Sequence, residues 1–543
     1  MRRRDMSVFL LSTGAGAALG AESMKPLEQS SNLPTPAEAA SNVIPKSLSY
    51  PEGDVRRYGA RQDSADNSAA FNLALLVSGH GGSAVLIPAG TWKITAPIQC
   101  VLGCSMSGVG QQSIIAPTAC DAMTFTTQAS YTGSRFFRDF QIVGTGTGAH
   151  TGICADMSAA SHARITGIQF SNISIQNFGV GIFCRGVWNS SFRDCFLYNN
   201  FRGYHFHGQS VLINIDGGFV HCGSIDGSGK SYGILVDSID GESCQSLHMN
   251  GVGLYAYDLN ISLDLALYAS IENCDVSEAK SIAIQLVTVH GGTTVRDCWI
   301  QTNGTGPTTG IHVADRASIE YDKIIIEGCT LICDRQHTGS VGIYVGSNQL
   351  GVISNGNSIG IASAAFDIGV RNGGAHNHVA KFNTIYAGGN AILINSAAAG
   401  VELGPNVVQH GAPLAFTDRT APDFSYYASG VFTFELSGMV QKTRGNVAWS
   451  ANGRTVLLSV ADDGLTGVSG SETMTGIGLP LCLTPLSRRH ATAHLIDNGA
   501  ASLGGASIGA DGQIVFAKDI HDKEFTGTGE KGLAGGSSIT YNF

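Results

Sequence analysis

Acidic residues are concentrated in one stretch near the middle of this chain, and paired carboxyl groups are the usual catalysts of glycosidic-bond hydrolysis. The stretch contains Asp237, Asp240, Glu242, Asp258, Asp264, Glu272, Asp275 and Glu278. Hydrolysis needs an acid and a base or nucleophile at ~5 to 9.5 Å from each other. We predict Asp264 and Asp275 as the first catalytic candidates, with Glu272 and Asp237 next.

β-Elimination is the alternative chemistry for a polysaccharide, and it needs a base together with stabilisation of negative charge. Arg296 or His312 could stabilise charge or move a proton, because histidine titrates near neutral pH. Calcium prefers several oxygen ligands, which the acidic stretch could supply for a uronate substrate, although no ligand spacing specifies a site. We therefore predict no metal and no other cofactor, with calcium as the one alternative for a uronate.

A repeated phrase indicates how the chain positions these residues. From about residue 135 the sequence repeats at roughly 22 to 32 residues, a period typical of a solenoid whose coils stack equivalent residues. Each copy has an apolar residue, a charged residue, a turn-former, Cys, a variable residue and an apolar residue, at 192–197, 271–276, 295–300 and 326–331.

Two sets of residues in this phrase have structural interpretations. The cysteines should form an inward ladder, because a buried free Cys behaves as a small hydrophobe; they are Cys195, Cys274, Cys298 and Cys329. Disulfides and a zinc site are weaker alternatives, because the total of 13 cysteines is odd and no ligand pairs are spaced for zinc. Asp194, Asn273 and Asp297 are predicted as turn residues that hydrogen-bond local backbone.

Outward-facing rows of side chains follow from the alternation of side chains along a strand. A second phrase gives the row Phe183, His205, Leu235, Asp264, Gln285, His312 and Tyr344. The first phrase gives the rows Arg193, Glu272, Arg296, Glu327 and Phe196, Asp275, Trp299, Thr330. We predict that these rows bind a glycan through His205, Phe196, Gln285, Arg296, Trp299, His312 and Tyr344. The alternative is an ordinary solvated face whose charges pair across strands.

The N-terminal part carries a specific pattern. It comprises the segment 54–60 (Asp-Val-Arg-Arg-Tyr-Gly-Ala), Asp63, Asp66 and the strand-like segment 84–92, which contains Pro-Ala-Gly. This pattern resembles the first coil of the pectate-lyase superfamily. The resemblance covers residues 54–92 and implies a right-handed parallel β-helix. A short helix ending near Val77 would cap its open apolar end. Asp63 and Asp66 are then turn and cap residues.

The resemblance also implies a class of function. Members of the superfamily are mostly extracellular glycan-active proteins, including pectate lyases, polygalacturonases, rhamnogalacturonan-degrading enzymes, epimerases and phage tailspike depolymerases. This chain lacks the polygalacturonase aspartate pairs and the Tyr-Asp-Pro-His signature of alginate epimerases. We therefore predict an exported protein that binds and cleaves a polysaccharide as a lyase or hydrolase. A non-catalytic glycan-binding or adhesion protein and a prophage tailspike-like structural protein are the alternatives.

Composition and charge agree with this class. Glycine accounts for 71 of the 543 residues, charged residues for 14% and hydrophobic residues for 43%. A disordered chain is excluded, because such chains are rich in charge and poor in apolar residues. The net charge of −10 argues against a nucleic-acid partner, which would require a basic face.

The fold class predicted for the whole chain is all-β. It is a single-stranded right-handed parallel β-helix with an N-terminal capping helix and a small C-terminal β-sandwich-like domain. Residues 1–21 resemble a twin-arginine export signal, which implies a bacterial periplasmic or secreted location, and their apolar run is too short to span a membrane. The remaining divisions are a linker at 22–50, the β-helix at 51–403, a linker at 404–424 and the C-terminal module at 425–543. That module resembles those of tailspike-like proteins, which implies a homotrimer.

Overall fold

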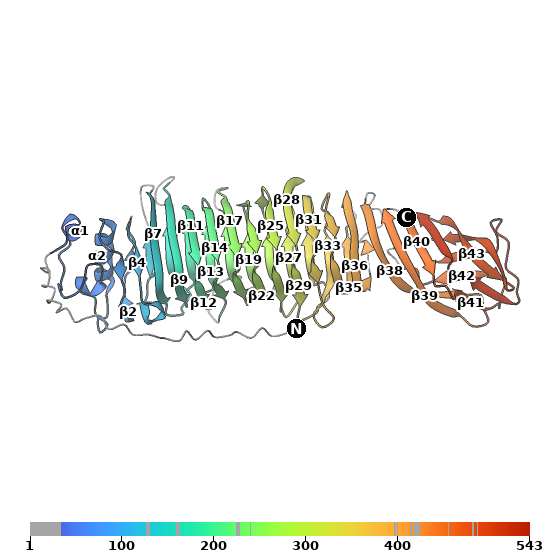
Figure 1. Ribbon diagram of the computed structural model, residues 1–543, viewed down its shortest axis with the longest axis horizontal. Helices are drawn as coiled ribbons and strands as arrows, with labels where there is room; N and C mark the ends of the chain where they lie inside the picture. Colours follow the sequence, from blue (N-terminus) through green and yellow to red (C-terminus); the bar gives the residue numbers. More distant parts are fainter. Residues whose placement is uncertain are drawn as a thin grey trace, which may run out of the picture.

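The computed structural model describes residues 34–542, except 102, 126–130, 159–162, 224–228, 239–240, 396–397, 399, 413–414, 417–423, 454, 481–482 and 486. The described chain is a rod with helices at one end, stacked strands along its length and a twisted sheet at the other end (Figure 1). The predicted all-β class is confirmed. The predicted export signal at 1–21 lies outside the described residues.

Short helices close the N-terminal end of the rod. They are α1 (Pro36–Ala40), η1 (Val55–Tyr58) and α2 (Ser68–Gly79), and a further turn, η2 (Gly110–Gln112), precedes β5. Phe71 and Leu75 of α2 are fully buried in the core that the helix shares with the first coil, so the predicted capping helix is confirmed. The Asp66 carboxylate accepts hydrogen bonds from the backbone N–H groups of Ser68 and Thr95, both at 3.0 Å. Asp66 is thus a turn and cap residue, as expected.

Helix α1 lies within the stretch that the sequence assigned to a linker. The Glu38 carboxylate accepts hydrogen bonds from Arg57 Nε at 2.6 Å, Arg57 Nη2 at 2.9 Å and the Tyr58 hydroxyl at 3.1 Å. Glu38 is fully buried and Arg57 nearly so. The described part of 22–50 is therefore packed structure held by a buried ion pair, which the polar and proline-rich composition of the segment did not reveal.

Parallel strands stack into three sheets, and each coil contributes one strand segment to each sheet. Sheet 1 contains β1 (Val85–Leu86), β4 (Met106–Ser107), β7 (Tyr131–Val143), β9 (Ile165–Gln176), β11 (Val187–Arg193), β14 (Val211–Asp216), β17 (Cys244–Asn250), β20 (Ala266–Leu267), β21 (Ser270–Glu272), β24 (Val289–His290), β25 (Thr293–Arg296), β28 (Glu320–Glu327), β31 (Gln349–Asn355), β34 (Val379–Lys381) and β36 (Val401–Ala412).

Strands β7 and β9 are long enough to continue into sheet 2. Sheet 2 also contains β2 (Gly90–Ile94), β5 (Ser113–Pro117), β12 (Phe196–Tyr198), β15 (Phe219–His221), β18 (Gly253–Tyr255), β22 (Asp275–Ala279), β26 (Trp299–Thr302), β29 (Thr330–Cys333), β32 (Ser358–Ile359) and the first half of β35 (Thr384–Ile394).

Sheet 3 closes the coil. It contains β3 (Ile98–Gln99), β6 (Met123–Phe125), β8 (Thr151–Asp156), β10 (Val180–Arg185), β13 (Arg202–His207), β16 (Tyr232–Asp237), β19 (Leu259–Leu263), β23 (Ile282–Leu286), β27 (Thr309–Val313), β30 (Val341–Val345), β33 (Phe366–Asn372), the second half of β35, and β37 (Ala415–Phe416). All these pairings are parallel, so the predicted parallel β-helix is confirmed.

The turn between sheets 1 and 2 explains the repeated phrase. Asp194, Asn273 and Asp297 have φ angles of 50°, 53° and 52°, and Gly328 takes the same place with φ 67°. Asp, Asn and Gly tolerate this left-handed conformation better than other residues do. The predicted turn ladder is therefore confirmed.

Residues that follow the turn point into the core. Cys195, Cys274, Cys298 and Cys329 are all buried, which confirms the inward ladder. The twelve described cysteines are free. Further along the rod, buried asparagines take over: Asn383 donates to Asn406 Oδ1 and accepts from Asn357, with side-chain distances of 3.1 and 3.0 Å. Each amide also satisfies backbone groups of neighbouring coils, which a buried polar group requires.

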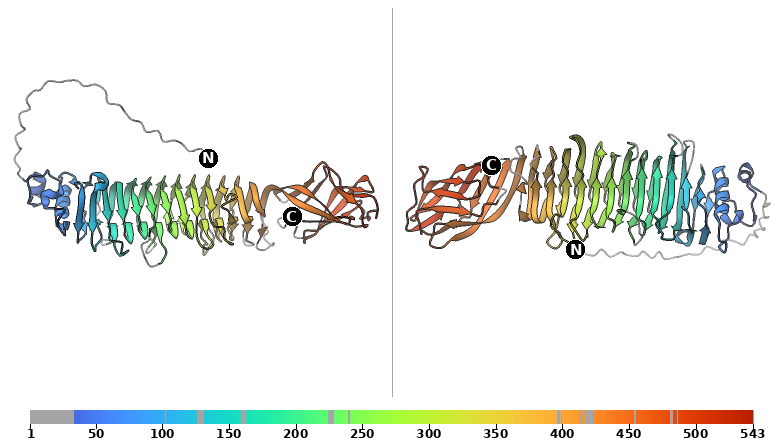
Figure 2. Two further views of the ribbon diagram at one scale, coloured as in Figure 1. Left: turned by 90° about the horizontal axis from the view of Figure 1, so that it is seen from below. Right: turned by 180° about the vertical axis from the view of Figure 1, so that it is seen from behind.

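Strand β38 (Phe424–Ser437) joins the helix to the C-terminal sheet. Its first half pairs in parallel with β36, and its whole length pairs antiparallel with β39 (Thr443–Gly453). The predicted linker at 404–424 thus includes the end of β36, which pairs with the first half of β35 and continues the ladder of sheet 2. Figure 2 shows from two directions that the C-terminal sheet continues the long axis of the rod.

The C-terminal part is one curled antiparallel sheet in the order β47-β40-β39-β38-β42-β45-β44-β43-β46-β41. Its other strands are β40 (Thr455–Val460), β41 (Leu465–Val468), β42 (Met474–Ile477), β43 (Arg489–Asp497), β44 (Ala500–Ile508), β45 (Ile514–Ala517), β46 (Glu530–Leu533) and β47 (Ser538–Asn542). The curled sheet encloses buried Phe434, Leu458, Leu533 and Ile539. A sandwich-like core therefore forms from one continuous sheet.

Candidate functional site

The outward row of sheet 3 follows the predicted register with one exception. Phe183 pairs with His205, His205 with Leu235, Gln285 with His312, and His312 with Tyr344. Between Leu235 and Gln285 the row contains Ser262, whereas the sequence placed Asp264 there. The strand ends at Leu263, so Asp264 lies after it, and the prediction was wrong for this residue because it shifted the phrase by two positions.

The four predicted catalytic carboxylates are distributed over different faces of the rod. Asp237 ends β16 and Asp264 follows β19, both at the end of sheet 3. Glu272 ends β21 in sheet 1, and Asp275 begins β22 in sheet 2. Sheet 1 separates Asp264 from Asp275, and its width of about seven residues at ~3.3 Å each is roughly 20 Å. One glycosidic bond therefore cannot contact both first candidates.

Glu272 and Arg296 belong to a row of charges on sheet 1. The register runs from Asn250 through Glu272 and Arg296 to Glu327. Arg296 Nε donates to Glu327 Oε1 at 2.8 Å, and both side chains are about 40% exposed. The row is therefore a solvated face whose charges pair across strands, which is the alternative interpretation given above. The Arg296 guanidinium is engaged in this ion pair.

Sheet 2 instead carries a row of aromatic side chains, which we call the aromatic face. Its residues are Phe196, Tyr198, Phe219, His221, Tyr255 and Trp299. They come from β12, β15, β18 and β26, whose register places Phe196 beside Phe219, Tyr198 beside His221, and His221 beside Tyr255. Phe196, Tyr198 and Trp299 are 40%, 48% and 38% exposed. Two exposed rings on β12, partly buried rings on the next two coils and the exposed ring of Trp299 four coils beyond β12 form a surface on which an extended ligand can stack.

The rings of the aromatic face contact one another. Tyr198 and His221 stack with centroids 5.1 Å apart and planes within 13° of parallel. Phe219 lies 5.8 Å from His221 and 5.0 Å from Tyr255. Gly253 makes the last contact possible, because a Cβ there would lie 2.8 Å from the Tyr255 ring. The rings thus form a continuous apolar surface over three coils.

Polar groups adjoin the aromatic face at Asp275. The Tyr255 hydroxyl donates to Asp275 Oδ2 at 2.6 Å, and Ser277 Oγ donates to Asp275 Oδ1. Burial raises the pKa of Tyr255, as do its bond to Asp275 and the nearby charges of Asp275 and Glu278. The negative charges of Asp275 and Glu278 therefore both favour the neutral form of the Tyr255 hydroxyl. Asp275 also pairs in register with Trp299, so the acid lies directly beside the last exposed ring.

His221 is the titratable ring within the aromatic face. Burial lowers its pKa, while Glu278 acts in the opposite direction and Lys280 adds to the lowering. Its Nδ1 has no hydrogen-bond partner among the described residues. At neutral pH the ring is therefore a neutral imidazole that can stack on a ligand and can accept a proton.

Sequence reasoning found Phe196, Asp275 and Trp299 but missed the rest of this site, including Glu278 as a site residue. Tyr198 lies two residues after Phe196 on the same face of β12. Phe219, His221 and Tyr255 lie on coils that lack the cysteine phrase. The usable signal was the turn itself: Gly-Gly at 217–218 and Gly at 251 occupy the position of Asp194, so the next strand could have been placed.

The other predicted binding residues lie on sheet 3. His312 and Tyr344 have ring centroids 4.9 Å apart, and the Tyr344 hydroxyl donates to Asp315 at 3.2 Å. Burial lowers the pKa of His312, against the opposing charge of Asp315. Gln285 accepts a hydrogen bond from Ser262 at 3.4 Å. These contacts lie on a different face from the aromatic rings of sheet 2.

His205 and Asp237 meet toward the ends of strands β13 and β16, of which His207 and Asp237 are the last residues. His205 Nε2 lies 2.9 Å from Asp237 Oδ1, and His207 Nδ1 lies 2.5 Å from the same oxygen. The pKa of Asp237 is lowered, because the bonds to the two histidines and their charges outweigh the opposing effect of burial. This group adjoins an ion pair between Arg185 and Glu242 at 3.5 Å.

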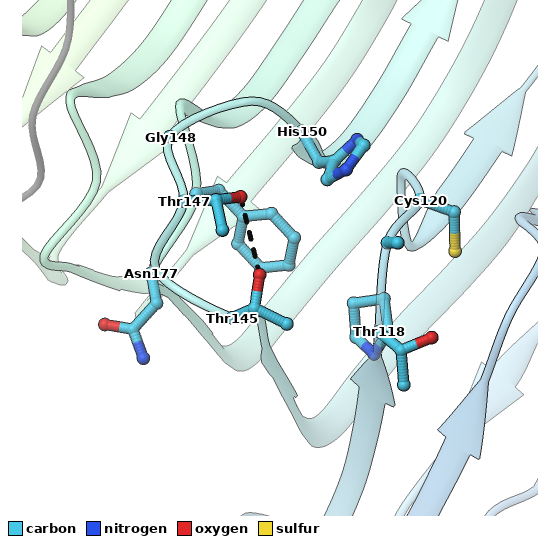
Figure 3. Close-up of a pocket in the computed structure, with 11 residues that line it drawn as sticks. Thr118, Cys120, Thr145, Thr147, Gly148, His150 and Asn177 are labelled. Carbon is cyan, nitrogen blue, oxygen red and sulfur yellow. Dashed lines mark hydrogen bonds between the residues drawn. The ribbon is translucent and has the colours of Figure 1, made fainter. Parts of the chain in front are cut away.

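The pockets in the surface do not coincide with these side chains. A pocket between the turns near Thr118, Thr145 and His150 is drawn in Figure 3, where Thr145 and Thr147 lie 3.5 Å apart. Its free volume of about 10 Å³ admits a water molecule but not a sugar ring. The C-terminal sheet has a hollow of about 990 Å³ lined by residues that include Arg488, His490, Phe516 and Lys523. Neither of these two hollows is lined by residues of the aromatic face or of the outward row of sheet 3.

Comparison with known proteins shows which solved structures share the fold. No protein-family model matches the sequence, and no curated protein matches it. The tailspike protein gp49 from Pseudomonas phage LKA1 superposes with a TM-score of 0.52 at 11% identity, covering 90% of this chain and 100% of that one. This chain has the fold of a phage tailspike. The resemblance drawn from residues 54–92 is thereby confirmed at the level of the fold.

Two further solved structures are similar at lower TM-scores. The Dettilon tailspike protein gp208 aligns with a TM-score of 0.46 at 13% identity over 89% of this chain and 92% of that one. The A-module of the mannuronan C-5 epimerase AlgE4 of Azotobacter vinelandii aligns with a TM-score of 0.45 at 14% identity over 69% of this chain and 99% of that one. Among the described residues, no helix is long and apolar enough to cross a membrane.

Proposed function

We propose that this protein binds a polysaccharide along sheet 2 and cleaves it beside Asp275. The observation that carries the proposal is the aromatic face, whose three exposed rings end beside a carboxylate. Sugar rings present C–H faces that stack on aromatic side chains, and polar groups at the edge then fix the hydroxyls. The tailspike fold is consistent with this use, since it offers long, flat and regularly spaced surfaces.

The spacing of the coils suits a polymer. Neighbouring strands lie ~4.8 Å apart, which is close to the length of one sugar unit, so successive coils can meet successive residues of a glycan. Phe196, Phe219 and Trp299 belong to one row of side chains on sheet 2. An oligosaccharide lying parallel to the rod axis would contact the rings in turn.

Asp275 and Glu278 are the carboxylates best placed for catalysis on this face. Both act on the Tyr255 hydroxyl, and Glu278 also acts on His221. In hydrolysis one carboxyl group would protonate the leaving oxygen and the other would act as base or nucleophile. In elimination the neutral imidazole of His221 would accept the proton while Lys280 stabilises negative charge. We rank hydrolysis first, because Asp275 and Glu278 both lie close enough to the Tyr255 hydroxyl to raise its pKa.

The test is a panel of purified polysaccharides with two readouts, new reducing ends and the absorbance of unsaturated products. We expect cleavage of at least one member, and its loss in Asp275→Asn and in Glu278→Gln. Glu327→Gln on sheet 1 is the matched control and should retain activity. Full activity in both sheet 2 variants would contradict the catalytic assignment, and reducing ends without unsaturated products would select hydrolysis.

Binding is tested separately from cleavage. Trp299→Ala and Tyr198→Ala should weaken retention on the cleaved polysaccharide, whereas Phe382→Ala, which removes an exposed ring at the turn between β34 and β35 further along the rod, should not. Binding without any product after prolonged incubation would instead favour the alternative of a non-catalytic glycan-binding or adhesion protein. Equal retention of all three variants would remove the aromatic face from the proposal.

We also propose a homotrimer that assembles through the C-terminal sheet. On strands β38, β39 and β40 the outward residues Ser429, Val431, Ala448, Ser450 and Leu457 form an uncharged patch of continuous register, and the Glu435–Arg444 ion pair lies beyond it on the same face. Val431 is 65% exposed in the single chain. The central part of a subunit interface is characteristically depleted of charge. Light scattering should give three times the chain mass, and a monomer at micromolar concentration would contradict the proposal.

We propose export to a bacterial periplasm or beyond, on the basis of the N-terminal arginines and the apolar run that follows them. Cell fractionation and the N-terminal mass of the isolated protein test this. A cleaved N-terminus in the periplasmic or secreted fraction is expected. An intact N-terminus on protein from phage-like particles would favour a prophage structural protein.

A further inference from the structure

Two histidines and an aspartate converge at the end of sheet 3, away from the aromatic face. His205 and His207 lie two residues apart on β13, so both point outward, and Asp237 is the register partner of His207 on β16. The His205 Nε2, His207 Nδ1 and Asp237 carboxylate atoms all lie within 4.8 Å of one another. Three potential ligand atoms therefore face one point.

The cluster is buried although its residues occupy outward positions. The imidazoles of His205 and His207 are only 8% and 10% exposed, while the Asp237 carboxylate is 37% exposed. The Phe183 ring covers them from the preceding coil, with centroids 5.0 Å from His205 and 6.0 Å from His207. The two imidazole rings are thus covered by Phe183 on one side. The cluster is exposed to solvent mainly at the Asp237 carboxylate.

Separations within the cluster fit a coordination sphere. Zinc binds its ligands tetrahedrally at ~2.1 Å, so two of its ligand atoms lie about 3.4 Å apart. The His205 Nε2 to Asp237 Oδ1 distance is 2.9 Å and the His207 Nδ1 to Asp237 Oδ1 distance is 2.5 Å. To reach that spacing, each imidazole nitrogen must move away from Asp237 Oδ1 by less than about 1 Å.

We propose that His205, His207 and Asp237 bind a divalent transition-metal ion, with zinc as the first candidate. Two nitrogen ligands favour zinc and its neighbours over calcium or magnesium, which prefer oxygen. Three protein ligands leave at least one position open for water or for a ligand oxygen. Binding here is independent of the polysaccharide proposal, since none of the three residues belongs to sheet 2.

Nearby charges support a bound cation. The Arg185 guanidinium, one strand before His207, is paired with Glu242 at 3.5 Å, so its positive charge is compensated. Gln209 also donates to Glu242 and holds this carboxylate. Asp264 lies one coil beyond Asp237, because its N–H donates to Val236 O at 3.0 Å. Arg185 and Glu242 thus compensate each other, and Asp264 adds a negative charge one coil beyond Asp237.

The test uses the purified full chain, stripped of metal with a chelator. Isothermal titration with Zn²⁺ alone should show one site per chain, and Co²⁺ should give the visible absorption bands of a nitrogen- and oxygen-ligated ion. His207→Gln and the isosteric Asp237→Asn should each weaken zinc binding by about 100-fold or more. His248→Gln, which alters an exposed histidine on sheet 1, should bind zinc as the parent does.

Thermal unfolding in the presence of chelator is the control for folding. The parent and the variants should then have the same melting temperature. Zinc should then raise the melting temperature of the parent and of His248→Gln only. Zinc binding of unchanged affinity in both His207→Gln and Asp237→Asn would overturn the proposal, as would a parent chain that binds zinc no more tightly than millimolar. Equal competition by Ca²⁺ would overturn the assignment to a transition metal.

Discussion

Replacing Glu38 by Gln should open the N-terminal cap of the β-helix. The Glu38 side chain is fully buried and Arg57 is 5% exposed, with the carboxylate bonded to Arg57 Nε and Nη2 and to the Tyr58 hydroxyl. Removing the carboxylate of a buried pair leaves the other charge without its partner of opposite sign and costs about 3 to 5 kcal/mol, although Arg57 keeps its hydrogen bond to Tyr50 O. Since 1.4 kcal/mol is a factor of about ten, opening of the cap should become about 10² to 4 × 10³ times more frequent.

The neighbouring Arg61–Asp63 pair provides the matched control. Its N···O distance is 2.7 Å, similar to that of the buried pair, but the two side chains are 73% and 70% exposed. Exposed pairs contribute little, because both partners are nearly as well solvated when apart. Asp63→Asn should therefore leave the cap unchanged. The two variants remove the same kind of carboxylate from the same end of the rod and differ in burial.

Hydrogen exchange followed by mass spectrometry measures the effect locally, on peptides from residues 34–60. Glu38→Gln should lose protection there and retain it in peptides from the central coils. The effect should also depend on pH. The pKa of Glu38 is lowered, chiefly by its hydrogen bonds from Arg57, so its contribution is present above the ordinary carboxyl pKa and is lost as the pH falls through the lowered pKa. The difference between parent and variant should shrink over that interval. Equal protection of Glu38→Gln and Asp63→Asn at neutral pH would refute the argument from burial.

Three further outcomes are expected. Burial lowers the pKa of His378 to about 4, so the unfolded chain binds a proton that the folded chain does not between that value and the ordinary histidine pKa. Stability should therefore fall as the pH is lowered through this interval, by an amount on the order of 3 kcal/mol, and denaturant titration of His378→Asn should show a weaker dependence. Gly328→Ala should destabilise more than Gly356→Ala: both have φ near 65°, but only the first would place a Cβ 2.3 Å from Asp297 Oδ1, and thermal unfolding compares them. Maleimide labelling of the native protein should modify Cys120 and Cys154 before any other described cysteine, because these two are the partly exposed ones; labelling of the buried ladder at the same rate would contradict the assigned coil register.

Much of the fold was accessible from the sequence because it depends on short-range rules. The turn after each strand of sheet 1 requires a left-handed residue, so Asp194, Asn273 and Asp297 recur at one position, and the next residue must face the core. That position is Cys195, Cys274 and Cys298 in the same coils. The coil, its inward ladder and its outward rows therefore followed from local geometry and period alone.

The residues that make up the candidate site were harder to predict from the sequence, because they depend on which strands become neighbours. Loops of unequal length separate the strands of sheet 3, and a shift of two residues placed Asp264 in the row where Ser262 lies. Similarly, Tyr255 comes beside Phe219 only through a coil that lacks the cysteine phrase. Neither contact has a signature in the sequence surrounding it.

The sequence by itself determined a capped parallel β-helix with a C-terminal β module, since periodic turns, a capping pattern and alternating side chains act within one or two coils. Only the tertiary structure decided which functional groups meet. It separated Asp264 from Asp275 by the width of a sheet, and it placed Asp275 beside Tyr255 and Asp237 beside two histidines. The physical reason is that residues on neighbouring coils touch at ~4.8 Å whatever the loop length between them. Loop lengths and register, which local patterns do not specify, therefore select the chemistry.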